Sequence, residues 1–377
     1  MNTDDLPTFL LAGGGTGGHV FPNIAVAEAL ARDQVAAEVG LLVSTRPSDA
    51  RWANRLPELP PLTLDVEAIP ARPFSARPWH WPGFYMDWRA GRKRVRERLE
   101  GSRVQAVVAT GGFVSGPVIA EASAAGVTTA LVDLDAAAGR ASRWLRSRVD
   151  CVFSAAPDAP EDAVPIGVPL REAARAEVDP ATARRELGLK PDRSTLLVIG
   201  GSQGAASINE TIMHLLAADR WPDALADWQL LHLCGSDHVR QMEDVLEVSP
   251  VAGRVIGFCD RPGLAWAAAD LAVSRAGASA VAEAWASETP TIFLPYPWHR
   301  DQHQRLNAQP LVEAEAAVVM DDRGRGDANA SDLVSHLAQL AGDTARRERM
   351  AAWMREHPRP DGAAVIAAWL RERLSGS

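Results

Sequence analysis

Three glycine-rich segments of this 377-residue chain have the composition of anion-binding loops: Gly13–His19, Gly111–Gly116 and Gly200–Gly204. Each follows a short apolar run that predicts a strand and precedes a stretch that predicts a helix. Glycine lets the backbone approach a ligand closely, and a helix N-terminus offers unpaired N–H groups and a positive dipole end. One such loop is equally consistent with a tight turn. Three at equivalent positions predict the binding of phosphate groups.

The first loop also fits the dinucleotide-binding pattern G-x-G-x-x-G, with Gly13, Gly15 and Gly18. That alternative requires an acidic residue at the end of the second strand to bind a ribose. The second strand ends here in Val43–Arg46, which contains no acid. Arg46 leaves NADP open as a ligand, whereas NAD is disfavoured. The Gly-Lys-Ser/Thr end of a P-loop is absent, so ATP hydrolysis is not indicated.

Polar residues of sugar-binding type occur in the second half of the chain. Ser274–Ser279 leaves a strand and opens a helix, and Glu283 lies four residues beyond Ser279 on the same helix face. A carboxylate at that place could accept hydrogen bonds from both ribose hydroxyls, although a lone glutamate on a helix is more often simply solvated. Gln304 and Asn307 share a face of the next predicted helix, and amides that both donate and accept suit sugar hydroxyls.

The elements that must position these residues alternate between strand and helix. Two series of apolar runs predict strands: Phe9–Ala12, Val39–Val43, Ala106–Ala109, Thr129–Leu134 and Val149–Phe153, then Thr195–Ile199, Gln229–Leu233, Arg254–Phe258, Leu271–Val273 and Thr291–Leu294. Helical stretches between them predict parallel sheets. We therefore expect an α/β protein with two doubly wound, Rossmann-like domains facing a central cleft.

The domain boundaries follow from the prolines between the two series. Ala155–Pro169 contains four prolines and is interpreted as the interdomain linker. We predict an N-terminal acceptor and membrane-side domain over residues 1–165 and a C-terminal donor domain over 166–350. Residues 351–377 should hold an amphipathic C-terminal helix that packs back on the N-terminal domain.

Composition limits the class of protein. Hydrophobic residues make up 47% of the chain and charged residues 23%, as in a globular protein, and the net charge of −9 disfavours a nucleic-acid partner. The cysteines, Cys151, Cys234 and Cys259, are too scattered for a disulfide framework or a zinc site. The acidic N-terminus does not resemble a signal peptide, and apolar runs of transmembrane length are absent. We expect a cytoplasmic protein whose membrane contact, if any, is peripheral.

Ala71–Arg98 differs from the acidic remainder because it is rich in aromatic and basic residues. Tryptophan and tyrosine favour the membrane interface, and cations favour anionic headgroups. Part of the segment should form the buried face of a crossover helix with solvated arginines. The proline-broken part reads as an exposed loop. The candidate membrane contacts are Trp79, Trp81, Phe84, Trp88, Arg89, Arg92 and Lys93.

Five of these motifs together resemble one enzyme family. Gly14–Pro22 (GGTGGHVFP), Gly111–Pro117 (GGFVSGP) and Gly200–Ala205 (GGSQGA) resemble the three glycine loops of the MurG enzymes. Arg275–Glu283 (RAGASAVAE) and His303–Ala308 (HQRLNA) resemble their donor-site helices. These enzymes are the peptidoglycan N-acetylglucosaminyltransferases that convert lipid I to lipid II. The order and spacing of the motifs hold from about residue 8 to residue 320.

The resemblance implies a GT-B fold and an inverting transfer from UDP-N-acetylglucosamine to a lipid-linked acceptor, without metal or cofactor, at the cytoplasmic face of the membrane. It implies diphosphate contacts from Arg171 and Ser202, uracil against the Cys259 backbone, and ribose on Glu283. The Ala278 backbone, Gln304 and Asn307 would lie near the sugar. The implied donor-binding set is completed by Thr16, Gly17, Gly18, Gln203, Gly204 and Ser279.

The chain departs from the family on the acceptor side. Phe113 stands where the family has tyrosine, and Val132–Asp135 (VDLD) replaces His-Glu-Gln-Asn. Phe113, Ser115 and Asp135 are the candidate acceptor-side residues. Asp133–Asp135 also spells D-x-D, a metal–diphosphate signature of a different glycosyltransferase fold, so a metal role is a weaker alternative.

An acceptor hydroxyl must lose its proton as it attacks the sugar. His19 is our first candidate for the base, since histidine is largely neutral at pH 7 and the helix N-terminus disfavours its charged form. Asp133 is the second candidate, and His19 could instead bind the diphosphate or cap its loop. Another acceptor, or a donor-binding protein that has lost catalysis, stays open at this stage.

Overall fold

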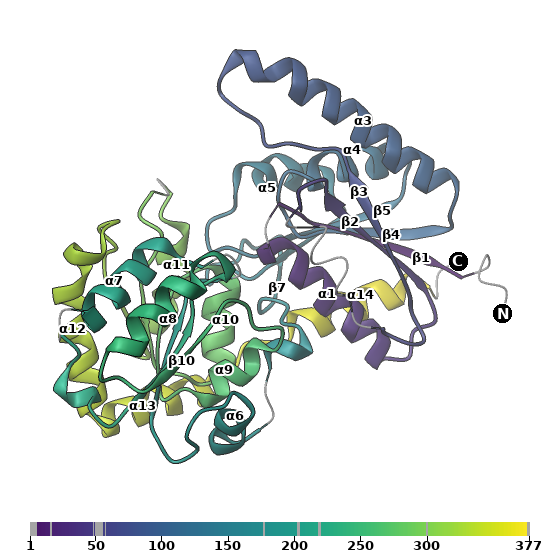
Figure 1. Ribbon diagram of the computed structural model, residues 1–377. Helices are drawn as coiled ribbons and strands as arrows, with labels where there is room; N and C mark the ends of the chain where they lie inside the picture. The colour runs from purple at the N-terminus through teal and green to yellow at the C-terminus, as the bar shows by residue number, and fades with distance from the viewer. Residues whose placement is uncertain are drawn as a thin grey trace. The chain divides into compact units, whose positions relative to one another are not determined.

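The computed structural model describes residues 6–15, 17–47, 49, 56, 58–175, 178–201, 204–217, 220–298 and 301–374. The chain divides into two compact units (Figure 1). Unit 1 comprises residues 1–171 and 360–377, and unit 2 comprises residues 172–359. Within the described part of the chain, no helix is both long and apolar enough to cross a lipid bilayer.

Unit 1 is built on a parallel sheet with the strand order β3-β2-β1-β4-β5-β6-β7. Its strands are β1 (Thr8–Ala12), β2 (Glu38–Ser44), β3 (Thr63–Ile69), β4 (Val104–Ala109), β5 (Thr128–Asp133), β6 (Cys151–Ser154) and β7 (Val164–Pro165). Its helices are α1 (Gly17–Arg32), α3 (Trp81–Glu100), α4 (Ser115–Ala124), α5 (Arg140–Leu145) and α14 (Gly362–Glu372), with 3₁₀ turns η2 (Pro78–His80) and η3 (Arg146–Arg148).

Unit 2 repeats this arrangement with the strand order β10-β9-β8-β11-β12-β13, again parallel. Its strands are β8 (Thr195–Ile199), β9 (Gln229–Leu233), β10 (Gly253–Ile256), β11 (Leu271–Ser274), β12 (Thr291–Phe293) and β13 (Ala317–Val319). Its helices are α6 (Pro180–Glu186), α7 (Ala206–Ala217), α8 (Val239–Val248), α9 (Pro262–Ala268), α10 (Ala278–Ala286), α11 (His303–Glu313), α12 (Gly326–Gly342) and α13 (Thr344–Glu356). Its 3₁₀ turns are η4 (Glu172–Ala174), η5 (Asp223–Leu225) and η6 (Ser236–His238).

The central strands form because their side chains are buried on both faces, as the two-sided cover of a parallel sheet requires. β1 and β8 are buried along their whole length. In each sheet the strands are added first on one side of the first strand and then on the other. The direction of winding therefore reverses between β1 and β4 in unit 1 and between β8 and β11 in unit 2. Ligands of such sheets bind at the carboxyl ends of the strands near this reversal. The doubly wound fold expected from the sequence is present in both units.

The segment predicted as a linker, Ala155–Pro169, lies entirely within unit 1. β7 pairs with β6 at the edge of the sheet, and Ile166 beyond it is fully buried. Proline has no N–H group, and an edge strand tolerates it because the backbone on its outer side pairs with no other strand. Pro165 can therefore lie within the sheet of unit 1 and is not evidence of a domain boundary. The division lies instead between Arg171 and Glu172.

The C-terminal residues are shared between the units. α13 belongs to unit 2, where Met350 and Met354 are buried in its two core clusters. α14 packs against α1 in unit 1, and the two helices lie side by side in Figure 1. Arg371 of α14 pairs with Asp33 at 2.8 Å, and the ring of Trp369 meets Phe153 edge-on. The last helix therefore completes the first domain.

Candidate active site

Gly13 and Gly15 of the first glycine loop have no space for a side chain. A Cβ on Gly13 would lie 2.3 Å from both the His19 carbonyl oxygen and Thr110 Oγ1, and Gly15 has a φ of +99°. The buried Asp49 carboxylate accepts hydrogen bonds from the Gly15 N–H at 2.7 Å and from the Ser44 hydroxyl at 2.5 Å. An acidic residue therefore does follow the second strand, but its carboxylate already accepts hydrogen bonds from these two groups of the protein. Gly17 is buried and Gly18 exposed at the start of α1.

His19 is oriented by the residue that follows β4. Its Nδ1 lies 2.9 Å from the Thr110 carbonyl oxygen, and the Thr110 hydroxyl donates to the His19 carbonyl oxygen at 2.7 Å. A carbonyl oxygen can only accept, so Nδ1 donates its proton and the lone pair available for accepting a proton is that of Nε2. Gly111 and Gly112 lie against the ring. The arrangement fixes which nitrogen can accept a proton.

The second loop is joined to the first by an aromatic contact. The Phe113 ring lies against Gly15, and the Arg46 guanidinium lies 4.8 Å above that ring while donating to the Gly15 carbonyl oxygen at 3.2 Å. Ser115 is fully buried, and its hydroxyl donates to the Gly111 carbonyl oxygen at 2.6 Å. The Ser115 hydroxyl therefore holds the loop closed.

Asp133 ends β5 as a buried carboxyl group. Burial raises its pKa, and the hydrogen bond with Ser142 and the charge of Arg146, 3.8 Å away, only partly oppose this effect. Asp135 is half-buried two residues further on. Among the described residues, no group of three or more histidine, cysteine, aspartate or glutamate side chains is arranged to hold a metal ion.

The third loop is buttressed by β9 and the turn after it. Gly204 has a φ of +76°, and a Cβ there would lie 2.0 Å from the Cys234 carbonyl oxygen. Asn209 donates to the same oxygen at 2.8 Å and accepts from Nε2 of His232 at 3.0 Å. Burial lowers the pKa of His232 to about 3, so this ring is neutral. The predicted contacts Thr16, Ser202 and Gln203 lie outside the described residues.

The helix carrying Glu283 begins with an uncapped turn. Gly277 precedes α10 with no side-chain cap, and Ala278 and Ser279 form its first turn, half-buried. Glu283 lies on the same helix, where the indole N–H of the fully buried Trp266 donates to its Oε2 at 2.9 Å. This bond orients the carboxylate that we assigned to the ribose.

The two amides of α11 make bonds that organise neighbouring loops. Asn307 is buried and donates to the Ala276 carbonyl oxygen at 3.1 Å, just before α10. Gln304 accepts from the Tyr296 N–H at 2.8 Å, beyond β12. Both side chains therefore hold the backbone of the carboxyl edge of the sheet.

Two further predicted contacts lie at the ends of elements. Cys259 follows β10 and is half-buried against the core of unit 2. Arg171 is the last residue of unit 1 before the chain enters unit 2, and its guanidinium lies 3.9 Å above the Phe21 ring of α1.

Sequence reasoning missed several residues that shape these loops, among them Asp49, Thr110 and Asp322. Asp322 follows β13 and is paired with Arg275 at 2.5 Å. No strand was predicted before Asp322, so its place at the sheet edge could not be predicted. Thr110 directly follows a predicted strand, and Asp49 lies a few residues beyond another. This position after a predicted strand was the signal that could have identified both residues.

Trp79, Trp81 and Phe84 do not lie in a loop as predicted, whereas Trp88 lies on a helix as predicted. Trp79 is in η2, whereas Trp81 and Phe84 are in the first turns of α3 and Trp88 is in its middle. Pro82 is tolerated there because first-turn N–H groups have no partner within the helix. Trp79 and Trp81 are 71% and 49% exposed, and the Phe84 ring stacks on that of Trp88.

The basic residues of α3 are partly neutralised. Arg92 and Arg96 both bind Glu121 of α4 at 2.6 Å, and Lys93 pairs with Glu97 at 3.7 Å. Arg89 lies over the exposed Tyr85 ring, 5.7 Å from its centroid. The charge available to a surface is therefore smaller than the sequence count suggests.

Comparison with known proteins gives consistent matches along the whole chain. The glycosyltransferase family 28 N-terminal domain matches residues 9–154, and the C-terminal domain of that family matches residues 195–366. A protein from Sorangium cellulosum is 36% identical, with 97% of this chain and 88% of that protein covered. One from Leifsonia xyli subsp. xyli is 35% identical, with 99% and 100% covered.

Both relatives are named UDP-N-acetylglucosamine–N-acetylmuramyl-(pentapeptide) pyrophosphoryl-undecaprenol N-acetylglucosamine transferase. Among solved structures, MurG of Acinetobacter baumannii superposes with a TM-score of 0.72 at 21% identity, covering 97% of this chain and 99% of that one. This structural likeness supports the shared fold of two Rossmann-like domains.

Proposed function

The chain belongs to the family of MurG N-acetylglucosamine transferases, and we propose that it joins N-acetylglucosamine from UDP-N-acetylglucosamine to the lipid-linked N-acetylmuramyl-pentapeptide by one inverting displacement. The transfer is the lipid I to lipid II step of peptidoglycan synthesis. The donor binds to unit 2, and unit 1 receives the acceptor and supplies the base.

The orientation of His19 is the observation that carries this mechanism. Because Nδ1–H is committed to the Thr110 carbonyl oxygen, Nε2 accepts the proton of the attacking hydroxyl. The same carbonyl oxygen then stabilises the imidazolium that forms. Loss of the proton as the hydroxyl attacks permits displacement of UDP in one step, which inverts the configuration at the anomeric carbon.

Binding of the departing diphosphate needs no metal ion in this proposal. The uncapped N-terminus of α10 and the N-terminus of α7 offer N–H groups and positive dipole ends to an anion. The D-x-D carboxylate Asp133 already faces the Arg146 guanidinium. A cation beside this carboxyl group disfavours its use as a metal ligand.

Turnover with defined substrates tests this function. We expect UDP release from UDP-N-acetylglucosamine only when lipid I is added, a β-linked product by NMR, and unchanged rates in excess EDTA. If UDP release requires a different acceptor, that acceptor replaces lipid I in this proposal. Absence of turnover with tight UDP binding would instead favour a donor-binding protein without catalysis.

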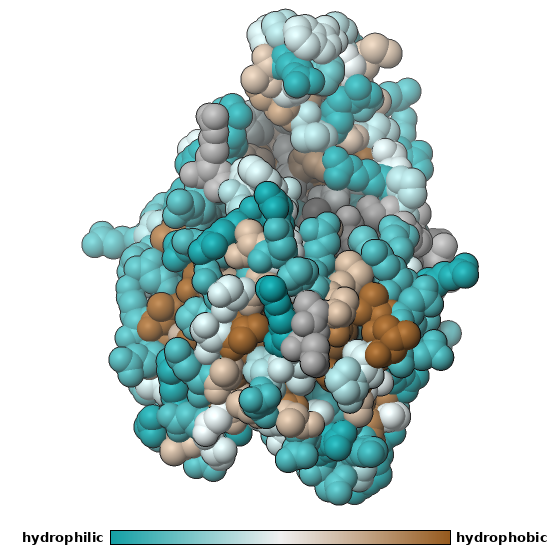
Figure 2. All heavy atoms as spheres, turned by 60° about the vertical axis from the view of Figure 1, so that its left-hand side comes forward, coloured by the Kyte–Doolittle hydropathy of each residue, from teal (hydrophilic) through white to brown (hydrophobic). Residues whose placement is uncertain are grey.

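Membrane contact through η2 and the start of α3 is the second part of the proposal. Trp79, Trp81 and Tyr85 are exposed next to Arg77 and Arg89, a combination suited to an anionic interface. Each basic residue near such a surface contributes roughly 1 kcal/mol. The face seen in Figure 2 is mostly hydrophilic, with apolar side chains in separate small groups.

Replacing Trp79, Trp81 and Phe84 together with serine should release the protein from anionic vesicles, because the interfacial anchors are lost. Turnover with a water-soluble acceptor should survive. Trp298→Ser is a control for the loss of an exposed tryptophan elsewhere on the surface, because Trp298 and Trp79 are both 71% exposed. Sedimentation with vesicles measures binding, and equal sedimentation of the triple variant and the parent would rule out this contact.

A further inference from the structure

A single buried carboxylate lies at the carboxyl edge of the sheet in unit 2. The Asp322 side chain is fully buried after β13. Its Oδ2 accepts from the Ser207 hydroxyl and from Arg275 Nη1, each at 2.5 Å. Its Oδ1 accepts from the Gly324 N–H at 2.7 Å and from the Asn329 side chain at 2.8 Å. Burial alone would raise the pKa of Asp322, but these donors outweigh it and lower the pKa, so the group is ionised.

The donors come from different strand–helix connections. Ser207 lies in the first turn of α7, directly after the third glycine loop. Arg275 directly follows β11 and precedes the turn that opens α10. It also donates to Ser207 Oγ at 2.7 Å and to the Leu294 carbonyl oxygen beyond β12 at 2.9 Å. One carboxylate thus connects the loops after β8, β11, β12 and β13.

Strand order makes this possible, because β8, β11, β12 and β13 are consecutive neighbours in the sheet. Their carboxyl ends therefore lie along one edge. The Arg275 guanidinium is half-buried, and its charge is balanced there by Asp322. Removing one partner of such a pair leaves the other charge uncompensated, so the surrounding loops must rearrange.

We propose that Asp322 is a positioning residue for the sugar-nucleotide donor: through Ser207 and Arg275 it fixes the N-terminus of α7 relative to that of α10. This inference rests on the proposed donor site. The N–H groups of both helices must meet oxygens of the same diphosphate at hydrogen-bond distance, so their spacing has to be set before the donor arrives. Asp322 itself touches no substrate.

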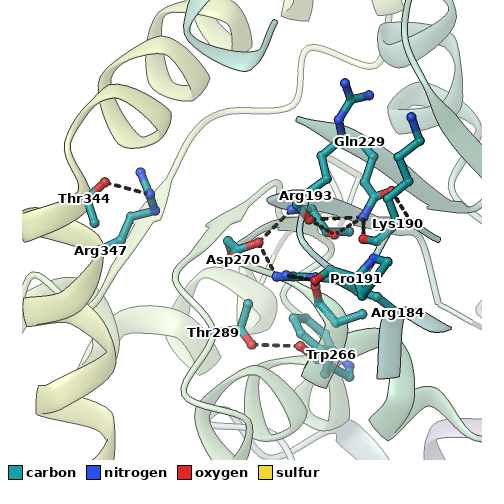
Figure 3. Close-up of polar contacts among 12 residues, drawn as sticks. Arg184, Lys190, Pro191, Arg193, Gln229, Trp266, Asp270, Thr289, Thr344 and Arg347 are labelled. Carbon is teal, nitrogen blue, oxygen red and sulfur yellow. Dashed lines mark hydrogen bonds and ion pairs between the residues drawn. The ribbon is translucent and has the colours of Figure 1, made fainter. Parts of the chain in front are cut away.

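The same unit contains a matched arginine–aspartate pair at the opposite edge of the sheet. Asp270 precedes β11, and its Oδ2 accepts from Arg184 at 2.6 Å and from the Thr195 N–H at 2.7 Å (Figure 3). Arg184 also donates to the carbonyl oxygens of Ala268 and Pro191. This pair stabilises the amino ends of β8 and β11, away from the proposed donor loops.

Comparing Asp322→Asn with Asp270→Asn separates positioning from general stability. Both variants should lower the melting temperature. Asp322→Asn should raise the KM for UDP-N-acetylglucosamine and the Kd for UDP about 10-fold, with kcat reduced less than about 3-fold. Asp270→Asn should leave both constants within about 2-fold of the parent. Equal donor constants in the two variants would overturn the inference.

Two further variants complete the experiment. If Asp322→Asn does not fold, Ser207→Ala removes one link while keeping the Arg275 pair, and should raise the donor KM about 3-fold; an unchanged KM overturns the inference. Glu283→Ala is measured in parallel by UDP calorimetry. If Glu283→Ala weakens UDP binding and Asp322→Asn does not, only the positioning role fails. If neither weakens it, the proposed donor site itself is wrong.

Discussion

Replacing His19 with alanine should lower turnover at least about 100-fold, while UDP affinity changes by less than about 2-fold. The variant removes the Nε2 lone pair that the Thr110 carbonyl oxygen selects by holding the proton on Nδ1. The acceptor hydroxyl must then lose its proton to water. Steady-state kinetics with lipid I at saturating donor measures the effect, and calorimetry with UDP measures the binding.

His19→Gln is the matched control for a loop-capping role. A glutamine amide can donate to the Thr110 carbonyl oxygen but is not a base, so its turnover should stay near that of the alanine variant. Recovery of activity by glutamine would assign His19 to loop structure. Asp133→Asn should cost less than His19→Ala. Weaker UDP binding with intact saturated turnover in His19→Ala would make His19 a donor ligand and direct the search for the base to Asp133.

Glu283→Ala should weaken UDP binding by on the order of 2 kcal/mol, a loss of roughly 30-fold, because two ribose hydroxyls lose their acceptor. The variant also leaves the buried Trp266 indole N–H without its partner, so part of any change could be structural. Glu283→Gln keeps an acceptor for Trp266 and should bind UDP with intermediate affinity. Thermal unfolding without ligand reports the structural part. Unchanged calorimetric affinity in a folded alanine variant would falsify the assignment.

The sequence was informative where a strand is buried on both faces. β1 and β8 are continuous apolar runs, and such runs have few alternatives in a protein of alternating strands and helices. β3 was missed because it is an edge strand that carries two acids, Asp65 at an exposed position and Glu67 at a half-buried one. Arg98 and Arg94 of α3 pair with these two acids, so the charges that obscured the strand are part of its packing.

The candidate site was predictable at the level of loops and less so at the level of single atoms. Glycine spacing located the three loops because positive φ and close contacts exclude other residues there. The tautomer of His19 depends on Thr110, about ninety positions away, and no local pattern encodes it. Likewise, Ser115 and Asn307 match family motifs, yet the structure uses their polar groups within the protein.

Because α14 completes unit 1, it affects the order in which the two units can fold during synthesis. Unit 2 is one uninterrupted segment, whereas unit 1 needs residues 360–377, which are synthesised after the whole of unit 2. The face of α1 that α14 covers stays uncovered until these residues have been made. The second domain can therefore reach its native state first, and the first domain is completed only after the second has been synthesised.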